Sequence, residues 1–281
     1  MANLADFLDK LPILLVGLLM LATMTLAAGA GYFLRRRVRR MLTNNGAKEE
    51  GGAEGYIVSA VIGLVALLLG FTFALAVGRF ETRRALVLQE ANAIGTSYLR
   101  VQGLPEPHRT RLSQILASYT NNRVQLGTAS PDKMAPLIVA SDRLLVELWA
   151  GTLAATDTIG NSALASSLHS TVNEVIDMDS ARKAARKVRV PGEVFLALWV
   201  YIAVTAGMLG YSRSETQGRL LAGILFLLFT MSYMLIIDID RPAGGNIVEG
   251  QGPMIELRET LKQQPPGTFD IWRKPVAVPA P

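Results

Sequence analysis

The sequence predicts an all-α membrane protein with four transmembrane helices and a soluble domain that is a helical bundle. Half of the 281 residues are hydrophobic, and the charged residues, 18% of the chain, cluster between long apolar runs. Four of these runs are long enough to cross a bilayer as helices. Between the second and the third run, apolar residues recur at helical spacing, and no convincing stretch alternates β-branched and polar residues.

The first predicted span covers 11–34 and follows a short polar segment, 1–10. A cleaved signal peptide is the alternative, but the apolar run is long for one, and its positive charges come after it. These charges are five arginines within 35–40, which we interpret as a topology anchor and not as a nucleic-acid patch. A loop rich in glycine and asparagine, 43–55, leads to the second span.

The second predicted span covers 56–80 and continues as one long helix to about residue 102, because no proline interrupts it. At 1.5 Å per residue such a helix would be roughly 65 to 70 Å long. In its apolar part, small residues recur at every fourth position, namely Ala66, Gly70, Ala74 and Gly78. Such a ladder lets helices approach closely in lipid. It predicts either packing within the chain, or contact between subunits or the lining of a pore.

The soluble domain, 103–190, is predicted to hold amphipathic helices that form an antiparallel bundle with the end of the second helix. Breaks between these helices are indicated by the glycines and prolines at 103–107, 127–131 and 160–161. The third and fourth spans are predicted at 193–212 and 220–238. A C-terminal tail, 239–281, follows, with one short helix near 252–262 and a proline-rich end.

Four spans place the two short loops on one face of the membrane, and both termini with the soluble domain on the other. The first short loop carries six Lys and Arg residues and the second carries two. By the positive-inside rule the short loops are cytoplasmic, so the termini and the soluble domain lie on the non-cytoplasmic side of the cell membrane. Arginines within 79–84 and 182–189 lie beside the opposite face and argue against this orientation.

The sequence offers no recognisable chemistry for an enzyme. Cysteine is absent, and the two histidines, His108 and His169, have no metal-ligand spacing. Glycine-rich phosphate loops and a G-x-S-x-G motif are also missing. We therefore expect no catalytic residues, no metal and no cofactor. The expected partners are the lipid bilayer, further copies of the chain and small ions, and not nucleic acid.

Two clusters of charged residues lie at the ends of predicted spans. Where the second helix leaves the membrane, the sequence has Arg79, Glu81, Arg83, Arg84 and Glu90. In an oligomer these residues would form a charged ring that attracts anions, whereas the alternative is that they snorkel to the lipid boundary. The fourth span ends in Asp238, Asp240, Arg241 and Pro242. Acids are unfavourable at the C-terminus of a helix, so a partner such as an arginine of the second helix is expected.

Both regions resemble the bestrophin-like membrane proteins of bacteria and plants. The resemblance rests on Gly70-Phe-Thr-Phe73, Phe80-Glu-Thr-Arg-Arg84, Gln89-Glu-Ala-Asn-Ala93, Leu104-Pro-Glu-Pro107 and Asp240-Arg-Pro242, and it covers roughly 10–262. After the last motif, the family usually continues with Phe-Ser-Gly, where this chain has Ala243-Gly-Gly. The resemblance implies similarity to bestrophins, which are pentameric anion channels, although the acidic calcium clasp of bestrophins is not found here.

The leading functional hypothesis is a homo-oligomeric membrane channel or pore, with anions as the permeant ions. Polar residues are few in the second span, with Ser59 and Thr72 the candidates, so Phe71 or Phe73 would form a hydrophobic gate. The alternative is a non-conducting membrane scaffold or sensor whose helical extramembrane domain binds a partner.

Overall fold

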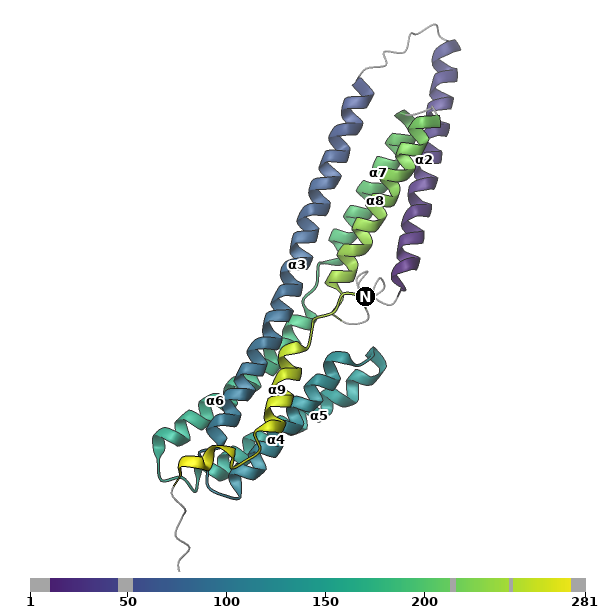
Figure 1. Cartoon of the computed structure of the whole chain (residues 1–281). Coiled ribbons are helices and arrows are strands. Elements are labelled where there is room, and N and C mark those ends of the chain that lie inside the picture. The colour runs from purple at the N-terminus through teal and green to yellow at the C-terminus, as the bar shows by residue number, and fades with distance from the viewer. Residues whose placement is uncertain (1–10, 45–52, 213–215, 243–244, 274–281) are drawn as a thin grey trace, which may run out of the picture. The chain divides into compact units, whose positions relative to one another are not determined.

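The computed structural model describes residues 11–44, 53–212, 216–242 and 245–273. The predicted polar segment 1–10, most of the loop 43–55 and the last residues of the tail lie outside these ranges. Every regular element within them is helical, which confirms the all-α prediction. The elements are α2 (Ile13–Asn44), α3 (Ala53–Val101), α4 (His108–Thr128), α5 (Pro131–Thr156), α6 (Ser162–Lys187), α7 (Gly192–Ser212), α8 (Thr216–Asp240), α9 (Gly252–Gln263) and the 3₁₀ helix η1 (Thr268–Trp272) (Figure 1).

Four helices are long and apolar enough to cross a membrane. The candidate spans are Ile13–Met41, Gly55–Val101, Ser162–Ser212 and Gly218–Asp240. They correspond to α2, to α3, to α6 together with α7, and to α8. α2 continues well beyond residue 34, where the sequence-based span ends, because the arginines that follow favour helix and no glycine or proline interrupts them before Gly46. The chain is therefore a multi-pass membrane protein.

The chain divides into two compact units. The membrane unit comprises Met1–Phe80 and Val188–Val248, and the helical unit comprises Glu81–Lys187 and Glu249–Pro281. The helical unit is thus larger than the predicted domain 103–190, because it includes the second half of α3 and the segment with α9. Since α3 is one helix of 49 residues, it contributes its first part to one unit and its second part to the other.

In the membrane unit, α2, α7 and α8 run side by side (Figure 1). The tightest approach joins α2 to α7: a Cβ atom on Gly31 would lie 2.0 Å from the carbonyl oxygen of Gly207, and one on Gly210 would lie 2.0 Å from that of Ala28. Glycines at these crossings bring the two backbones into contact, as is usual for helices packed in lipid. Around them, the core of the unit includes Met20 and Met24 of α2, Val65 and Leu69 of α3, Leu198 and Ile202 of α7, and Phe229 and Tyr233 of α8.

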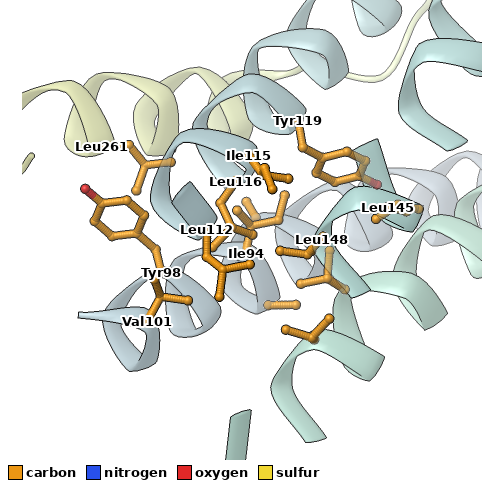
Figure 2. Close-up of a cluster of buried hydrophobic side chains, with 14 of the residues drawn as sticks. Ile94, Tyr98, Val101, Leu112, Ile115, Leu116, Tyr119, Leu145, Leu148 and Leu261 are labelled. Atoms are coloured by element: carbon orange, nitrogen blue, oxygen red, sulfur yellow. The ribbon is translucent and has the colours of Figure 1, made fainter. Parts of the chain in front are cut away.

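The helical unit surrounds a separate apolar core. The second half of α3 contributes Ile94, Tyr98 and Val101, which Figure 2 shows beside residues of α4, α5 and α9. Those residues are Leu112, Ile115, Leu116, Tyr119, Leu145, Leu148 and Leu261, and α6 adds Leu168, Val172 and Val175. Most of them recur every three or four positions, so one face of each amphipathic helix is buried and the opposite face is left exposed.

Candidate functional site

The exposed face of α3 in the membrane unit carries the ladder of small residues. Ala66, Gly70, Ala74 and Gly78 are all exposed, and a Cβ atom added to Gly70 or Gly78 would meet nothing within 4 Å. The buried stripe of α3 runs instead through Val58, Val65, Leu69, Thr72 and Ala76. α3 therefore packs against its own unit mainly through other residues, and the ladder remains available to a further molecule.

Two phenylalanines flank this ladder. The side chains of Phe71 and Phe73 are 61% and 40% exposed. Phe73 also lines a groove of about 440 Å³ between α3 and α8. Ala66 and Gly70 line the α3 side of this groove, and Ser232 is one of the residues that line the α8 side. The edge of the ladder thus borders a groove within the membrane unit.

The same face of α3 continues into the helical unit. Beyond Gly78, the residues that follow on this face at intervals of three or four positions are all exposed. They are Glu81, Ala85, Leu88, Asn92, Thr96 and Leu99. From Ala85 to Leu99 no exposed residue of α3 is charged. A second groove, of about 410 Å³, lies between Asn92, Thr96 and their neighbours on α3 and residues such as Glu256 and Leu257 of α9.

The candidate charged ring divides into exposed and buried members. Glu81 and Arg84 are exposed and lie 3.6 Å apart on one turn of α3. Arg79 is half-buried, and within the part of the chain that the structure describes its Nη1 atom is buried without a hydrogen-bond partner. Arg83 is buried and forms an ion pair with Glu249, so its charge is compensated inside the helical unit.

Glu90, the fifth ring candidate, is completely buried at the centre of a charge network. Its carboxylate accepts hydrogen bonds from the Tyr119 hydroxyl at 2.7 Å and from the guanidinium groups of Arg123 and Arg182. Arg123 also pairs with Asp179 at 3.0 Å. Two buried carboxylates therefore face two buried arginines, and the four charges balance across α3, α4 and α6.

The network extends to the surface of the helical unit through Lys183. Its ammonium group lies 2.6 Å from Asp179 and also forms an ion pair with Asp142 of α5. On the other side of the bundle, the Ser141 hydroxyl donates to the buried Asn122 amide oxygen at 2.6 Å. Polar contacts thus tie α5 to both α4 and α6.

Burial and neighbouring charges shift the proton affinities in this network. Burial, followed by the negative charge of Glu90, raises the pKa of Tyr119 well above its ordinary value. Burial alone would lower the pKa of Arg123, but Tyr119, Glu90 and Asp179 raise it. For Arg186, which lies one turn beyond Arg182, burial and the charge of Arg182 lower the pKa. The hydrogen-bonded forms at neutral pH are therefore a neutral Tyr119 and a charged Arg123.

The motif at the end of α8 forms a junction within the membrane unit. The Asp238 carboxylate accepts hydrogen bonds from the backbone N–H groups of Asn246 and Ile247 at 2.9 and 3.2 Å. Asp240 accepts the N–H of Val190 at 3.1 Å, and Arg241 donates to the carbonyl of Leu11 at 2.9 Å. Backbone amides are thus partners of the two acids, and they offset the unfavourable position of these acids at a helix C-terminus.

The described residues hold no group of three or more His, Cys, Asp or Glu side chains that could bind a metal ion. One of the two histidines, His169, lies with its ring 5.3 Å from that of Trp149.

Comparison with protein families identifies the relatives of this chain. The model of the Bestrophin-like domain matches residues 21–248, which include all four spans except the start of α2. The chain belongs to the Bestrophin-like family. This membership confirms the resemblance inferred from the motifs in α3 and at the end of α8. A comparison with curated protein sequences found no significant match.

Solved structures share the fold of this family member. A point mutant of a bacterial bestrophin homologue from Klebsiella pneumoniae matches with a TM-score of 0.63 and 15% identity, over 89% of this chain and 96% of that chain. A second structure of such a homologue from Klebsiella pneumoniae matches with a TM-score of 0.61 and 14% identity, over 90% and 96%. The fold therefore recurs in chains that share few residues with this one.

Several ion pairs of the charge network could not be predicted from the sequence, because the paired residues lie far apart along the chain. Arg123 and Arg182 lie 33 and 92 positions from Glu90, and Glu249 lies 166 positions from Arg83. A weaker signal was present in α6, where Asp179, Arg182 and Lys183 lie three or four positions apart near the apolar Val172 and Val175. Charged residues that share a face with core residues of an amphipathic helix indicate a buried ion pair.

Replacing Glu90 tests how strongly this network stabilises the helical unit. Glu90→Gln keeps the size of the side chain but removes the negative charge that buried Arg123 and Arg182 share, and only Arg123 keeps Asp179 as well. The free energy of unfolding should therefore fall by about 3 to 5 kcal/mol. Glu81→Gln is the matched control, because its exposed pair with Arg84 should contribute less than about 1 kcal/mol. Thermal unfolding in detergent measures both, and equal melting temperatures for the two variants would show that the network is not needed for stability.

Proposed function

We propose that this protein is a homo-oligomeric membrane channel, not an enzyme, in which α3 lines the pore. The observation that carries this proposal is the continuous exposed face of α3. Exposed positions of a helix in water normally carry charged residues, whereas the exposed residues of α3 from Ala85 to Leu99 carry no charge. The ladder from Ala66 to Gly78, on the same face, consists of small residues. Contact with α3 of other copies around an axis accounts for both features. Membership of the Bestrophin-like family supports the proposal, because bestrophins are pentameric anion channels.

The narrow part of the proposed pore lies within the membrane unit. Small residues of the ladder let α3 helices of different copies approach closely, and the larger Phe71, exposed beside them, supplies a ring of apolar side chains. Such a ring stops ions when it is dry and conducts when it is wetted. Phe73 is the second candidate for this gate, although its position at the groove next to α8 makes it less exposed.

Ion preference is set at the mouth of the proposed pore, where α3 leaves the membrane unit. Arg83 and Glu90 are buried in ion pairs and contribute little to the field there. Arg79, Glu81 and Arg84 remain, so each subunit adds two positive charges and one negative charge. The net positive ring concentrates anions, and salt screens it over about 8 Å at physiological ionic strength.

Reversing the exposed charge of the ring should reverse the ion preference. Arg84→Glu changes the net charge of the ring from positive to negative in each subunit, so a channel that prefers chloride should then prefer potassium. Arg143→Glu is the control, since Arg143 is likewise an exposed arginine paired with a glutamate on its own helix, but it lies on α5. The measurement is the reversal potential of reconstituted protein in an asymmetric salt gradient.

Two results would contradict the channel proposal. If wild-type protein passes no current, the non-conducting scaffold or sensor becomes the better account of the same fold. If current flows but its selectivity is the same in wild type, Arg84→Glu and Arg79→Gln, then α3 does not supply the ring.

Association of subunits should depend on the ladder of α3. Gly70→Leu adds a bulky side chain where close contact between copies is proposed, so it should shift the detergent-purified protein toward smaller species. Ala197→Leu is the matched control, because Ala197 is an exposed residue of α7 away from this face. Light scattering after size-exclusion chromatography gives the mass, and an unchanged mass for Gly70→Leu would refute a close contact at the ladder.

We also propose that the helical unit and both termini lie on the non-cytoplasmic side, because the C-terminal end of α2, at 35–40, holds the densest group of arginines. The chain has no cysteine, so single cysteines report topology cleanly. In intact cells an impermeant maleimide should label Asn121→Cys, on an exposed position of α4, and should not label Gly55→Cys at the start of α3. The opposite pattern would place the helical unit in the cytoplasm.

A further inference from the structure

A pocket in the membrane unit lies at the level where α7 ends and α8 begins. Its volume is about 440 Å³, and its walls come from α2, α7 and α8. Thr25, Ala28, Gly29 and Tyr32 belong to α2, whereas Leu209 and Gly210 belong to the last turns of α7. The first turns of α8 complete it with Arg219, Gly223 and Phe226 among their residues. This volume falls within the range of about 300 to 1,000 Å³ that is usual for small-molecule sites.

The pocket results from unequal packing of the three helices. On one side, Gly210 lets the backbone of α7 touch α2, because a Cβ atom there would lie 2.0 Å from the carbonyl oxygen of Ala28. On the other side, a Cβ atom on Gly29 or on Gly223 would meet nothing within 4 Å. α2 and α7 thus form a closed wall, while α8 is separated from α2 at this level by the space of the pocket.

The lining is mostly apolar, and its polar side chains lie at the end where α8 begins. Leu209, Ala222 and Phe226 supply apolar walls, and the Thr25 hydroxyl is satisfied by the carbonyl of Leu21 at 2.7 Å. Arg219, in the first turn of α8, and Tyr32 are exposed at the polar end. An apolar cavity with a cation at one end is complementary to an acyl chain that carries an anionic head.

The surroundings of the pocket carry further positive charge. α2 continues past Tyr32 into the basic stretch, in which Arg36, Arg37 and Arg40 are exposed. Arg35 is held at the end of α7, where it donates to the carbonyls of Tyr211 and Ser212 at 2.9 and 2.6 Å. Groups of basic residues directly beside a membrane helix attract anionic lipid head groups. The N-terminal turn of α8 adds backbone N–H groups that favour a phosphate.

From this geometry we propose that the pocket binds an acyl chain of an anionic phospholipid, with the phosphate of the head group at Arg219. The apolar walls hold the chain, and the arginines select the charge of the head group. This inference requires that the protein is inserted in a membrane, but it does not depend on conduction. A failure of the channel proposal would therefore leave it unchanged.

Native mass spectrometry of the full-length protein in detergent tests this site. Wild-type protein is mixed with equal amounts of phosphatidylglycerol and phosphatidylcholine that carry the same acyl chains, and it should retain phosphatidylglycerol in preference. Gly223→Leu fills the pocket and should abolish this retention. The matched control, Ile224→Phe, adds bulk at the neighbouring exposed position of α8, outside the pocket, and should bind as wild type does.

A second variant separates the head group from the chain. Arg219→Gln should weaken retention of phosphatidylglycerol by about fivefold, the effect of one basic residue beside an anionic lipid, and should weaken that of phosphatidylcholine less, because its choline cation offsets the phosphate charge. Because Arg219 is exposed, this variant keeps the test valid even if Gly223→Leu does not fold. Glycerol 3-phosphate alone should not bind, since it lacks the chain. Equal retention of both lipids by wild type, retention unaffected by Arg219→Gln, or binding of the free head group would overturn the proposal.

Discussion

The buried carboxylate of Glu90 is the interaction on which the arrangement of the helical unit depends. A carboxylate without exposure to water is costly unless donors surround it, and here Tyr119, Arg123 and Arg182 supply them. Because these donors come from α4 and α6, Glu90 reaches all of them in only one orientation of α3 about its helix axis. The same orientation leaves the opposite side of α3, with Asn92, exposed. The charge network and the uncharged exposed face are therefore two consequences of one orientation.

The membrane unit is stabilised in a different way. Lipid provides no hydrophobic drive between helices, so close packing and satisfied polar groups decide the arrangement. Glycines bring the backbones of α2 and α7 into contact, and the rings of Phe195 and Trp199 pack edge-on against Tyr233 of α8. In the first half of α3, a Cβ atom added to Gly63, Gly70 or Gly78 would meet nothing within 4 Å. Within its own unit, α3 thus leaves much of its small-residue surface uncovered.

The sequence was sufficient for the features that depend on local composition. Length and hydropathy located the four spans, and the absence of proline between Pro12 and Pro105 predicted α3 as one helix. The partners of the charged residues were beyond such reasoning, because ion pairs between distant helices follow from the packing of the whole unit. Arg83 and Glu90 were grouped with Arg79 and Arg84 by their nearness in sequence. The structure places Arg83 and Glu90 on the buried side of α3 and Arg84 on the exposed side, because successive residues of a helix are rotated by about 100° around its axis.

The hydrogen bonds at the end of α8 also affect how the protein fits bilayers of different thickness. Asp238 and Asp240 tie the last turn of this helix to the chain segments at Val190, Asn246 and Ile247, so this end has little freedom to shift. A helix of 25 residues spans about 37 Å, which exceeds the roughly 30 Å of hydrocarbon in an average bilayer. Adjustment to a thinner or thicker membrane then falls on the opposite end, where the long side chains of the arginines after α2's apolar run can reach the lipid surface at different depths. Hydrophobic mismatch in this protein is thus absorbed at one face of the bilayer.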